Sequence, residues 1–280
     1  MIPSPRAWGG RPPITIHDPR RLEATDIPMS ANPAELLAWD DAFLGETEAT
    51  GRHFLWFWES RVPFVVVGYG QRIHETVDVE QCQHAGIPIL RRRSGGGTVL
   101  QGSGCLTYGI TLTIDSNPAL SSVDSTNRWI MEKQAQSLGG LERLQIGIDG
   151  YTDLTLATTD GKRKFSGNAQ RRTRKAVLFH GTILHGMDLG LVGRVLRLPK
   201  DRPSYRGSRS HAEFLTLLPC RAEEIRKAVT RAWDAWPSSA SLPWERHTEA
   251  MEVRYGHPAW HTHREERRSG KDLGGALSTR

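Results

Sequence analysis

Cysteine is scarce in this sequence, and long apolar runs are missing. The 280 residues include three cysteines, Cys82, Cys105 and Cys220, and none forms a CxxC pair. Three scattered cysteines argue against a disulfide framework and against a zinc ribbon. No apolar stretch reaches the ~20 residues that a membrane-spanning helix needs, and the first ten residues lack the apolar core of a secretory signal. These absences predict a cytoplasmic protein in a reducing setting, with no membrane partner.

Several motifs with well-understood chemistry are also missing. The sequence contains no P-loop, no dinucleotide-binding GxGxxG, no HExxH of the zinc proteases and no GxSxG of the hydrolases. His257, His261 and His263 cluster near the end of the chain, but no cysteine or acidic ligand pattern joins them. We therefore expect no zinc there.

A strong excess of one charge is missing too. Lys and Arg number 37 against 31 Asp and Glu, which gives a net charge of +6, and 38% of the residues are hydrophobic. This balance excludes an intrinsically disordered chain. The mild positive charge favours acidic partners, such as nucleotides, nucleic acid or an acidic protein, without choosing among them.

Signals of regular structure begin near residue 32. Residues 1–31, rich in Pro, Arg and Gly, are expected to form an extended or partly ordered arm. Asn32, Pro33 and Glu35 together predict a helix start, with Asn at the cap and Pro in the first turn. The expected helices are 33–44, 78–84, 125–138 and 222–236.

Strands outnumber helices along the chain. Residues 53–58 and 62–67 predict a hairpin, because β-branched and aromatic residues flank a short connection. Residues 104–114 alternate with period two, which predicts one buried face and one more polar face. The other expected strands are 87–90, 153–158, 164–170 and 177–184. Hairpin-like pairs with helices between them predict an α+β fold with a mixed, mostly antiparallel sheet flanked by helices.

Two segments carry residues suited to chemistry. Residues 91–99, RRRSGGGTV, combine glycines that let backbone N–H groups approach an anion with arginines that supply charged donors. This pattern is typical of a nucleotide or acyl-phosphate cradle, and a flexible turn with solvated arginines is the alternative. Lys164 follows an expected hairpin turn at Asp160–Gly161, within GKRKFSGNAQRR. A solvated basic hairpin or a nucleic-acid patch is the alternative there. His180 and Asp153, taken singly, are more typical of structural residues.

In order, these segments resemble the lipoate–protein ligase A family. The matching patterns are RRxSGGGTV at 91–99, Asp-Leu at 153–154, KxSGxAxR at 164–171 and HGTxL at 180–184. The resemblance covers residues 32–260 and implies a biotin/lipoate-ligase catalytic domain, similar to class II tRNA synthetases. Residues 261–280 would then be a loose tail, with no C-terminal accessory domain. Gln101 and Thr152 depart from the pattern, since some members have His and Asn at those positions.

The resemblance implies two half-reactions. ATP, with Mg²⁺, and lipoate or octanoate would give acyl-AMP and pyrophosphate. A lysine of a lipoyl carrier domain would then take the acyl group. The implied carriers are the E2 component of a 2-oxoacid dehydrogenase, the H protein of glycine cleavage or a similar domain, with a separate accessory subunit as a further possible partner.

The resemblance also assigns roles to residues. Lys164 is the implied catalytic residue, bridging the acyl carbonyl and the α-phosphate, and Asp153 is implied to bind Mg²⁺ or to orient Lys164. The implied ATP- and acyl-AMP-binding residues are Arg92, Gly95, Gly96, Gly97, Thr98, Val99, Leu100, Asp153 and Lys164. The implied acyl-pocket residues are Gly167, Ala169, His180, Gly181 and Thr182.

Two rival functions remain open. An octanoyltransferase of the same fold would work without ATP through a cysteine thioester. Residues 139–172, where such a transferase would place its nucleophile, contain no cysteine, so the ligase is favoured. Cys105, which follows the glycine-rich segment, is the cysteine that could approach the site. A non-enzymatic acyl-carrier or RNA-binding protein is the second rival. RNA binding would require aromatic residues among basic ones on an exposed sheet face, whereas the Trp and Phe residues here fall on expected buried stripes. Nucleic acid is therefore not an expected partner.

Overall fold

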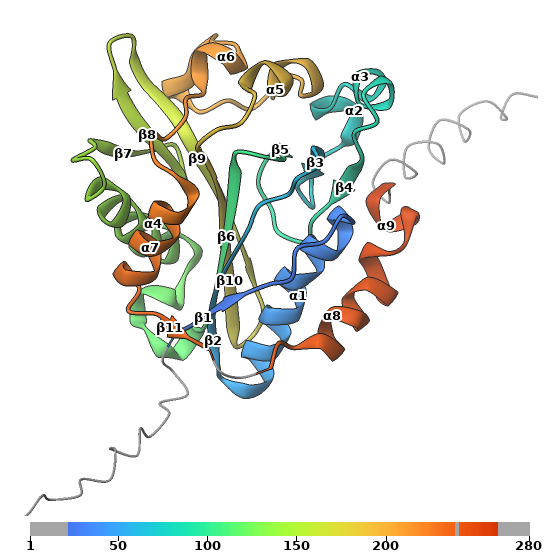
Figure 1. The fold of residues 1–280 in the computed structure, drawn as a ribbon, viewed down its shortest axis with the longest axis vertical. Coiled ribbons are helices and arrows are strands. Elements are labelled where there is room, and N and C mark those ends of the chain that lie inside the picture. The colour runs from blue at the N-terminus through green and yellow to red at the C-terminus, as the bar shows by residue number, and fades with distance from the viewer. Residues whose placement is uncertain (1–21, 239–240, 263–280) are drawn as a thin grey trace, which may run out of the picture.

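The computed structural model describes residues 22–238 and 241–262, which contain two β-sheets flanked by helices (Figure 1). The large sheet has the strand order β11-β1-β2-β6-β10-β9-β8-β7, and the small sheet has the order β4-β3-β5. In the large sheet β1 runs parallel to its two neighbours, and every other pair is antiparallel. The predicted α+β fold with a mixed, mostly antiparallel sheet is confirmed.

The bounds of the elements are as follows. The strands are β1 Leu22–Asp26, β2 His53–Trp58, β3 Phe64–Val67, β4 Ile89–Arg91, β5 Val99–Gln101, β6 Cys105–Thr113, β7 Ile146–Asp149, β8 Asp153–Thr158, β9 Gly161–Arg172, β10 Ala176–Leu184 and β11 Trp236–Pro237. The α-helices are α1 Pro33–Thr50, α2 Ile73–Thr76, α3 Val79–His84, α4 Val123–Gly139, α5 Leu189–Val195, α6 His211–Phe214, α7 Ala222–Ala232, α8 Trp244–Ala250 and α9 Pro258–Thr262. Short 3₁₀ turns η1 Ile114–Ser116, η2 Pro118–Ser121 and η3 Ser204–Arg206, and a π-helical turn η4 Met251–Tyr255, complete the set.

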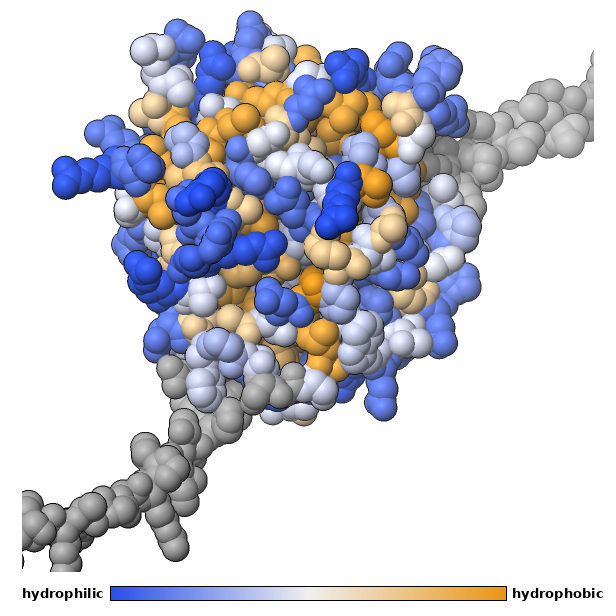
Figure 2. Space-filling model, viewed as in Figure 1, coloured by the Kyte–Doolittle hydropathy of each residue, from blue (hydrophilic) through white to orange (hydrophobic). Residues whose placement is uncertain are grey.

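Helices cover both faces of the large sheet. One core packs α4 and α7 against one face, and a second packs α1 and the Ala250–Tyr255 segment against the other (Figure 1). A third core lies between the small sheet and helices α3, α5 and α6. In the space-filling view, apolar side chains show in the upper half, in the region that α5, α6 and α2 border in Figure 1 (Figure 2).

Strand β6 corrects one expectation. Its alternation predicted a polar face, but every residue from Cys105 to Leu112 is buried. The face with Thr and Gly lies beneath α1, where the hydroxyl of Thr47 donates to Thr111 Oγ1 at 2.7 Å and Gly109 leaves room for the Trp56 ring. The strand is central and covered on both sides, so its small polar residues are packing residues.

The predicted hairpin over 53–67 is wrong. Strand β2 lies in the large sheet between β1 and β6, whereas β3 lies in the small sheet between β4 and β5. Both edges of β2 are already paired, because residues 22–26 of the expected arm form a parallel strand beside it. Residues 1–21 of the arm and residues 263–280 of the expected tail, with His263, lie outside the described residues.

Most expected helices and strands are confirmed. Asn32 caps α1, its side chain accepting from the Ala34 backbone N–H at 3.1 Å, and Asp78 caps α3 in the same way through Gln81. The helix expected over 222–236 ends earlier, at Ala232. There Asp234 turns the chain with φ of 47°, and Trp236 pairs with β1. No helix of the described residues has the length and apolarity to cross a membrane.

Candidate active site

A cavity of about 830 Å³ lies where the large sheet, the small sheet and the segment around α5 and α6 meet. Its volume lies within the range of small-molecule sites, ~300–1,000 Å³. All four sequence segments with suspected chemistry contribute to its wall. Of the residues predicted for the site, only Gly95 lies outside it. The predicted residues on the wall are Arg92, Gly96, Gly97, Thr98, Val99, Leu100, Asp153, Lys164, Gly167, Ala169, His180, Gly181 and Thr182.

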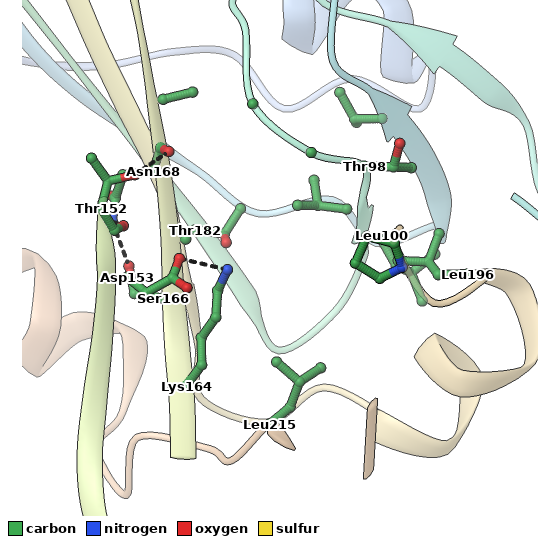
Figure 3. A pocket seen from close by; sticks show the side chains of 18 of the residues that line it. Thr98, Leu100, Thr152, Asp153, Lys164, Ser166, Asn168, Thr182, Leu196 and Leu215 are labelled. Atoms are coloured by element: carbon green, nitrogen blue, oxygen red, sulfur yellow. Dashed lines mark hydrogen bonds and ion pairs between the residues drawn. The ribbon is translucent and has the colours of Figure 1, made fainter. Parts of the chain in front are cut away.

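Lys164 is held at the centre of this wall by an ion pair. Its Nζ lies 2.7 Å from Asp153 Oδ1, and Figure 3 shows its side chain extending into the cavity with the amino end beside that carboxylate. About a quarter of the Lys164 side chain is exposed. A cation in this position can reach a bound anion without leaving its carboxylate partner.

A β-bulge brings Lys164 and Asp153 to the same face. Residue 164 pairs with Thr155, but Ser166 pairs with Leu154 and Gly167 with Asp153, so Phe165 is an extra residue in β9. Without the bulge, residues 164 and 167 would point to opposite faces. Gly167 leaves space for the lysine, because a Cβ at this position would lie 2.7 Å from Lys164 Nζ and the lysine side chain would have to shift.

The glycine-rich loop between β4 and β5 is braced from inside by Arg92. Its buried guanidinium donates to Ser94 Oγ and to the carbonyls of Val66, Gly95 and Gly97 at 2.6–3.3 Å. Burial lowers the pKa of Arg92 to about 10. Arg92 therefore shapes the loop from within, and its predicted contact with nucleotide phosphate remains a prediction.

Two hydrogen-bonded groups at the cavity include partners that the sequence analysis did not assign. Asn168 accepts from the Tyr108 hydroxyl at 2.7 Å and donates to the Thr152 carbonyl at 2.8 Å. His180 bonds Asp40 through Nδ1 and Ser94 through Nε2. A carboxylate among the apolar positions of α1 was the available signal for Asp40, whereas Tyr108 had been placed on the apolar face of β6.

Apolar side chains form another part of the wall. These residues are Leu37, Trp58, Val66, Leu100, Leu184, Met187, Val192, Leu196, Phe214 and Leu215. The cavity thus joins an apolar region, a cation and a glycine-rich loop.

The comparison with protein families decides the affiliation of the chain. Residues 32–230 match the family model described as "Lipoyl protein ligase A/B catalytic domain". The chain belongs to this family.

Solved structures of lipoate ligases share the fold. A bi-partite lipoate protein ligase from Thermoplasma acidophilum, studied with its E2 lipoyl domain, has a TM-score of 0.73 and 23% identity, covering 86% of this chain and 95% of that one. A lipoate-protein ligase A bound with ATP has a TM-score of 0.72 and 21% identity, covering 86% and 98%. LipL1 of P. falciparum, in complex with lipoate, has a TM-score of 0.63 and 16% identity, covering 86% and 73%. The predicted resemblance and the biotin/lipoate-ligase fold are confirmed.

In this lipoyl ligase A/B family chain, Asp153 is the predicted Mg²⁺ ligand. Carboxylate oxygen is a donor that Mg²⁺ accepts, and Mg²⁺ is often held by one or two carboxylates together with substrate phosphates. Asp153 fits that use, although Oδ1 faces Lys164 and Oδ2 accepts from Tyr205. The described residues contain no cluster of three or more metal-ligating side chains. The Mg²⁺ role of Asp153 remains a prediction.

Tyr205 is a further residue that the sequence analysis did not assign. It lies in η3, and its hydroxyl donates to Asp153 Oδ2 at 2.7 Å. Burial, followed by the Asp153 carboxylate, raises the pKa of the Tyr205 phenol, which therefore stays a donor. Tyr205 holds the carboxylate from one side while Lys164 holds it from the other.

Removing the Tyr205 hydroxyl should lower turnover while leaving substrate binding almost unchanged. For the ATP-dependent reaction that the family resemblance implies, we expect Tyr205→Phe to lower kcat for acyl-AMP formation about tenfold, because one charge-assisted bond to Asp153 is lost. The KM values for ATP and for the acyl acid should change less than twofold. Tyr151→Phe is the matched control, since Tyr151 also borders the cavity but is 88% exposed. Equal effects of the two substitutions on kcat would contradict a role for Tyr205.

Proposed function

We propose that this protein activates lipoate or octanoate with ATP to acyl-AMP and transfers the acyl group to a lysine of a lipoyl carrier domain. The observation that carries the proposal is the position of Lys164. Its side chain lines a cavity whose wall also includes the glycine-rich loop and a set of apolar side chains. An acyl adenylate needs these three features side by side, since it has a nucleotide phosphate, a reacting carbonyl and an apolar chain.

The two steps place the same demand on Lys164. In the first, a carboxylate oxygen of the acid bonds to the α-phosphorus of ATP and pyrophosphate leaves. In the second, the amine of the carrier lysine bonds to the acyl carbon, AMP leaves and the amine loses a proton. Negative charge grows beside the phosphate and the carbonyl in turn, and a fixed ammonium stabilises it in both transition states.

Three structural neighbours support this reaction. One T. acidophilum structure contains bound lipoic acid, another lipoate-protein ligase A contains ATP, and a third ligase was studied with an E2 lipoyl domain. Their identity with this chain, 21–23%, establishes the shared fold. The bi-partite ligase among them also supports the proposal that a separate accessory subunit assists this chain. The catalytic domain proposed here spans residues 32–260.

The cysteines argue against the transferase alternative. No cysteine of the described residues lines the cavity, and Cys82, Cys105 and Cys220 are all buried. Cys105 Sγ donates to Gln101 Oε1, and burial raises the pKa of the Cys105 thiol well above its ordinary value. A nucleophilic cysteine needs accessible thiolate.

We therefore expect Cys105→Ser to leave catalysis almost unchanged. Serine keeps the size and the donor to Gln101, so the rate of carrier acylation should stay within about twofold of the unmodified protein, well under the ~10²–10⁴-fold effects typical of catalytic groups. The measurement is acylation of a lipoyl carrier domain with ATP and octanoate, followed by mass spectrometry. A loss of a hundredfold or more would support the cysteine mechanism.

The proposed function is tested by pyrophosphate release and carrier acylation measured together. The purified chain is supplied with ATP, Mg²⁺ and lipoate or octanoate, first without and then with a lipoyl carrier domain. We expect pyrophosphate release that depends on the acid. Transfer of octanoate from one carrier to another without ATP, in the absence of acid-dependent release, would overturn the proposal in favour of a transferase.

A further inference from the structure

A buried chain of hydrogen bonds connects α1 to the glycine-rich loop. Asp40 Oδ2 lies 2.7 Å from His180 Nδ1, and His180 Nε2 lies 2.6 Å from Ser94 Oγ. Arg92 Nε donates to the same Ser94 oxygen at 2.9 Å. The four residues are between 2% and 8% exposed. These hydrogen bonds therefore run through the interior from Asp40 of α1, which lines the cavity, to the glycine-rich loop.

The first three residues have the order of a Ser-His-Asp triad, but Ser94 is not placed as a nucleophile. A triad serine presents Oγ to the substrate carbonyl. Ser94 is 2% exposed and lies outside the cavity wall, and its oxygen already accepts from Arg92. These residues therefore fix one another's positions, and Ser94 does not act as a nucleophile.

The donors and acceptors along this chain determine one another. With a neutral His180 ring, the Asp40 carboxylate accepts from Nδ1–H and Nε2 is left as an acceptor. The Ser94 hydroxyl can then donate to Nε2 while its oxygen accepts from Arg92 Nε. Arg92 is thereby oriented so that its Nη2 donates to the Gly95 and Gly97 carbonyls at 2.6 and 2.8 Å.

Asp40 depends on His180 as much as His180 depends on Asp40. Asp40 Oδ1 has no hydrogen-bond partner in the described part of the chain, so Oδ2 is the oxygen that anchors this carboxylate. A buried carboxylate with one charge-assisted bond fixes the ring that accepts from Ser94. The position of Arg92, and through it that of the loop, therefore depends on a residue of α1 that also lines the cavity.

We propose that Asp40 is a positioning residue for nucleotide binding, acting through His180, Ser94 and Arg92 on the glycine-rich loop. The inference rests on the proposed function, because it takes the loop as the site of ATP. It has a distinctive consequence. A change at Asp40, which bonds the predicted acyl-pocket residue His180, should weaken the binding of ATP more than the binding of the acyl acid.

The test is calorimetric titration of ATP and of octanoate, each alone, into Asp40→Asn. This variant keeps the size of the side chain and removes its charge. We expect the Kd of ATP to rise about tenfold, the factor for weakening one charge-assisted hydrogen bond. The Kd of octanoate should change less than twofold. Glu46→Gln is the matched control, since Glu46 lies on the same helix and pairs with Arg246 and Arg52 away from the cavity, and it should bind ATP normally.

A double-mutant cycle distinguishes transmission from general loosening. Ser94→Ala removes the hydrogen bonds at the other end of this series and should itself weaken ATP binding. If Asp40 acts through Ser94, Asp40→Asn adds less than twofold in the Ser94→Ala background. If the fold-increase in the Kd of ATP in the double variant equals the product of the two single increases, the proposal is overturned. A larger effect on the Kd of octanoate than on that of ATP would also overturn it.

Binding, measured without turnover, separates the two ways of failing. If the unmodified protein binds no ATP, the proposed function fails. If it binds ATP and both variants bind it equally well, with melting temperatures near that of the unmodified protein, the proposed function stands and the role of Asp40 fails. Should Asp40→Asn not fold, Ser94→Ala alone carries the test, and unchanged ATP affinity in it refutes the transmission.

Discussion

Replacing Lys164 by alanine should abolish acyl-AMP formation while leaving the fold intact. Removal of a single neutral donor from a transition-state site lowers the rate by ~10²–10³, and Lys164 carries a full charge, so we expect a loss of at least about 10³-fold. The fold should survive because the Lys164 side chain is partly exposed and its ion pair with Asp153 lies at the cavity wall. The measurement is acid-dependent pyrophosphate release, with a thermal melt of the same sample.

Lys162→Ala is the matched control for this substitution. Lys162 lies on the same strand two residues earlier, is 55% exposed and pairs with Asp149 outside the cavity wall. It should keep normal turnover. Lys164→Arg should fail like alanine, because the guanidinium is longer and planar and the Gly167 gap fits the ammonium end. Normal turnover of Lys164→Ala with a normal melt would remove Lys164 from the reaction.

Local signals were sufficient for most helices and strands. The cap at Asn32 is confirmed, and β8 spans the residues expected for it, because both depend on neighbouring residues. The hairpin over 53–67 failed for a non-local reason. Nothing in that segment shows that Leu22–Asp26 occupies one edge of β2 or that β6 occupies the other.

In the site, too, features with a local signal were predictable and features that depend on distant residues were not. The glycine-rich loop stood out by its composition, whereas Lys164 was singled out by the resemblance to the family. The pairing of Lys164 with Asp153 depends on a bulge at Phe165, which no residue pattern marks. Asp40 and Tyr205 were missed because their partners lie far along the chain; Tyr205 and Asp153, for example, are 52 residues apart.

A methyl group at position 68 should displace the glycine-rich loop. Gly68 follows β3, and a Cβ there would lie 2.1 Å from the Gly96 carbonyl oxygen and 3.1 Å from that of Gly97. These are backbone atoms, so no side chain can rotate away and the loop itself must shift. Since a misplacement of ~1 Å can lower a rate about 100-fold, we expect Gly68→Ala to reduce acyl-AMP formation by about that factor, together with weaker ATP binding.

Gly70→Ala shows whether this effect comes from the close approach or from losing a glycine. A Cβ at Gly70 meets no atom within 4 Å, and its backbone does not require positive φ. Gly70→Ala should therefore bind ATP and turn over normally, although it changes the same Gly-Tyr-Gly segment. If both variants lose activity equally, the segment matters through its flexibility. The two variants differ in which atoms their new methyl groups contact. If ATP binding is lost in Gly68→Ala alone, the close approach of residue 68 to the loop therefore positions the nucleotide.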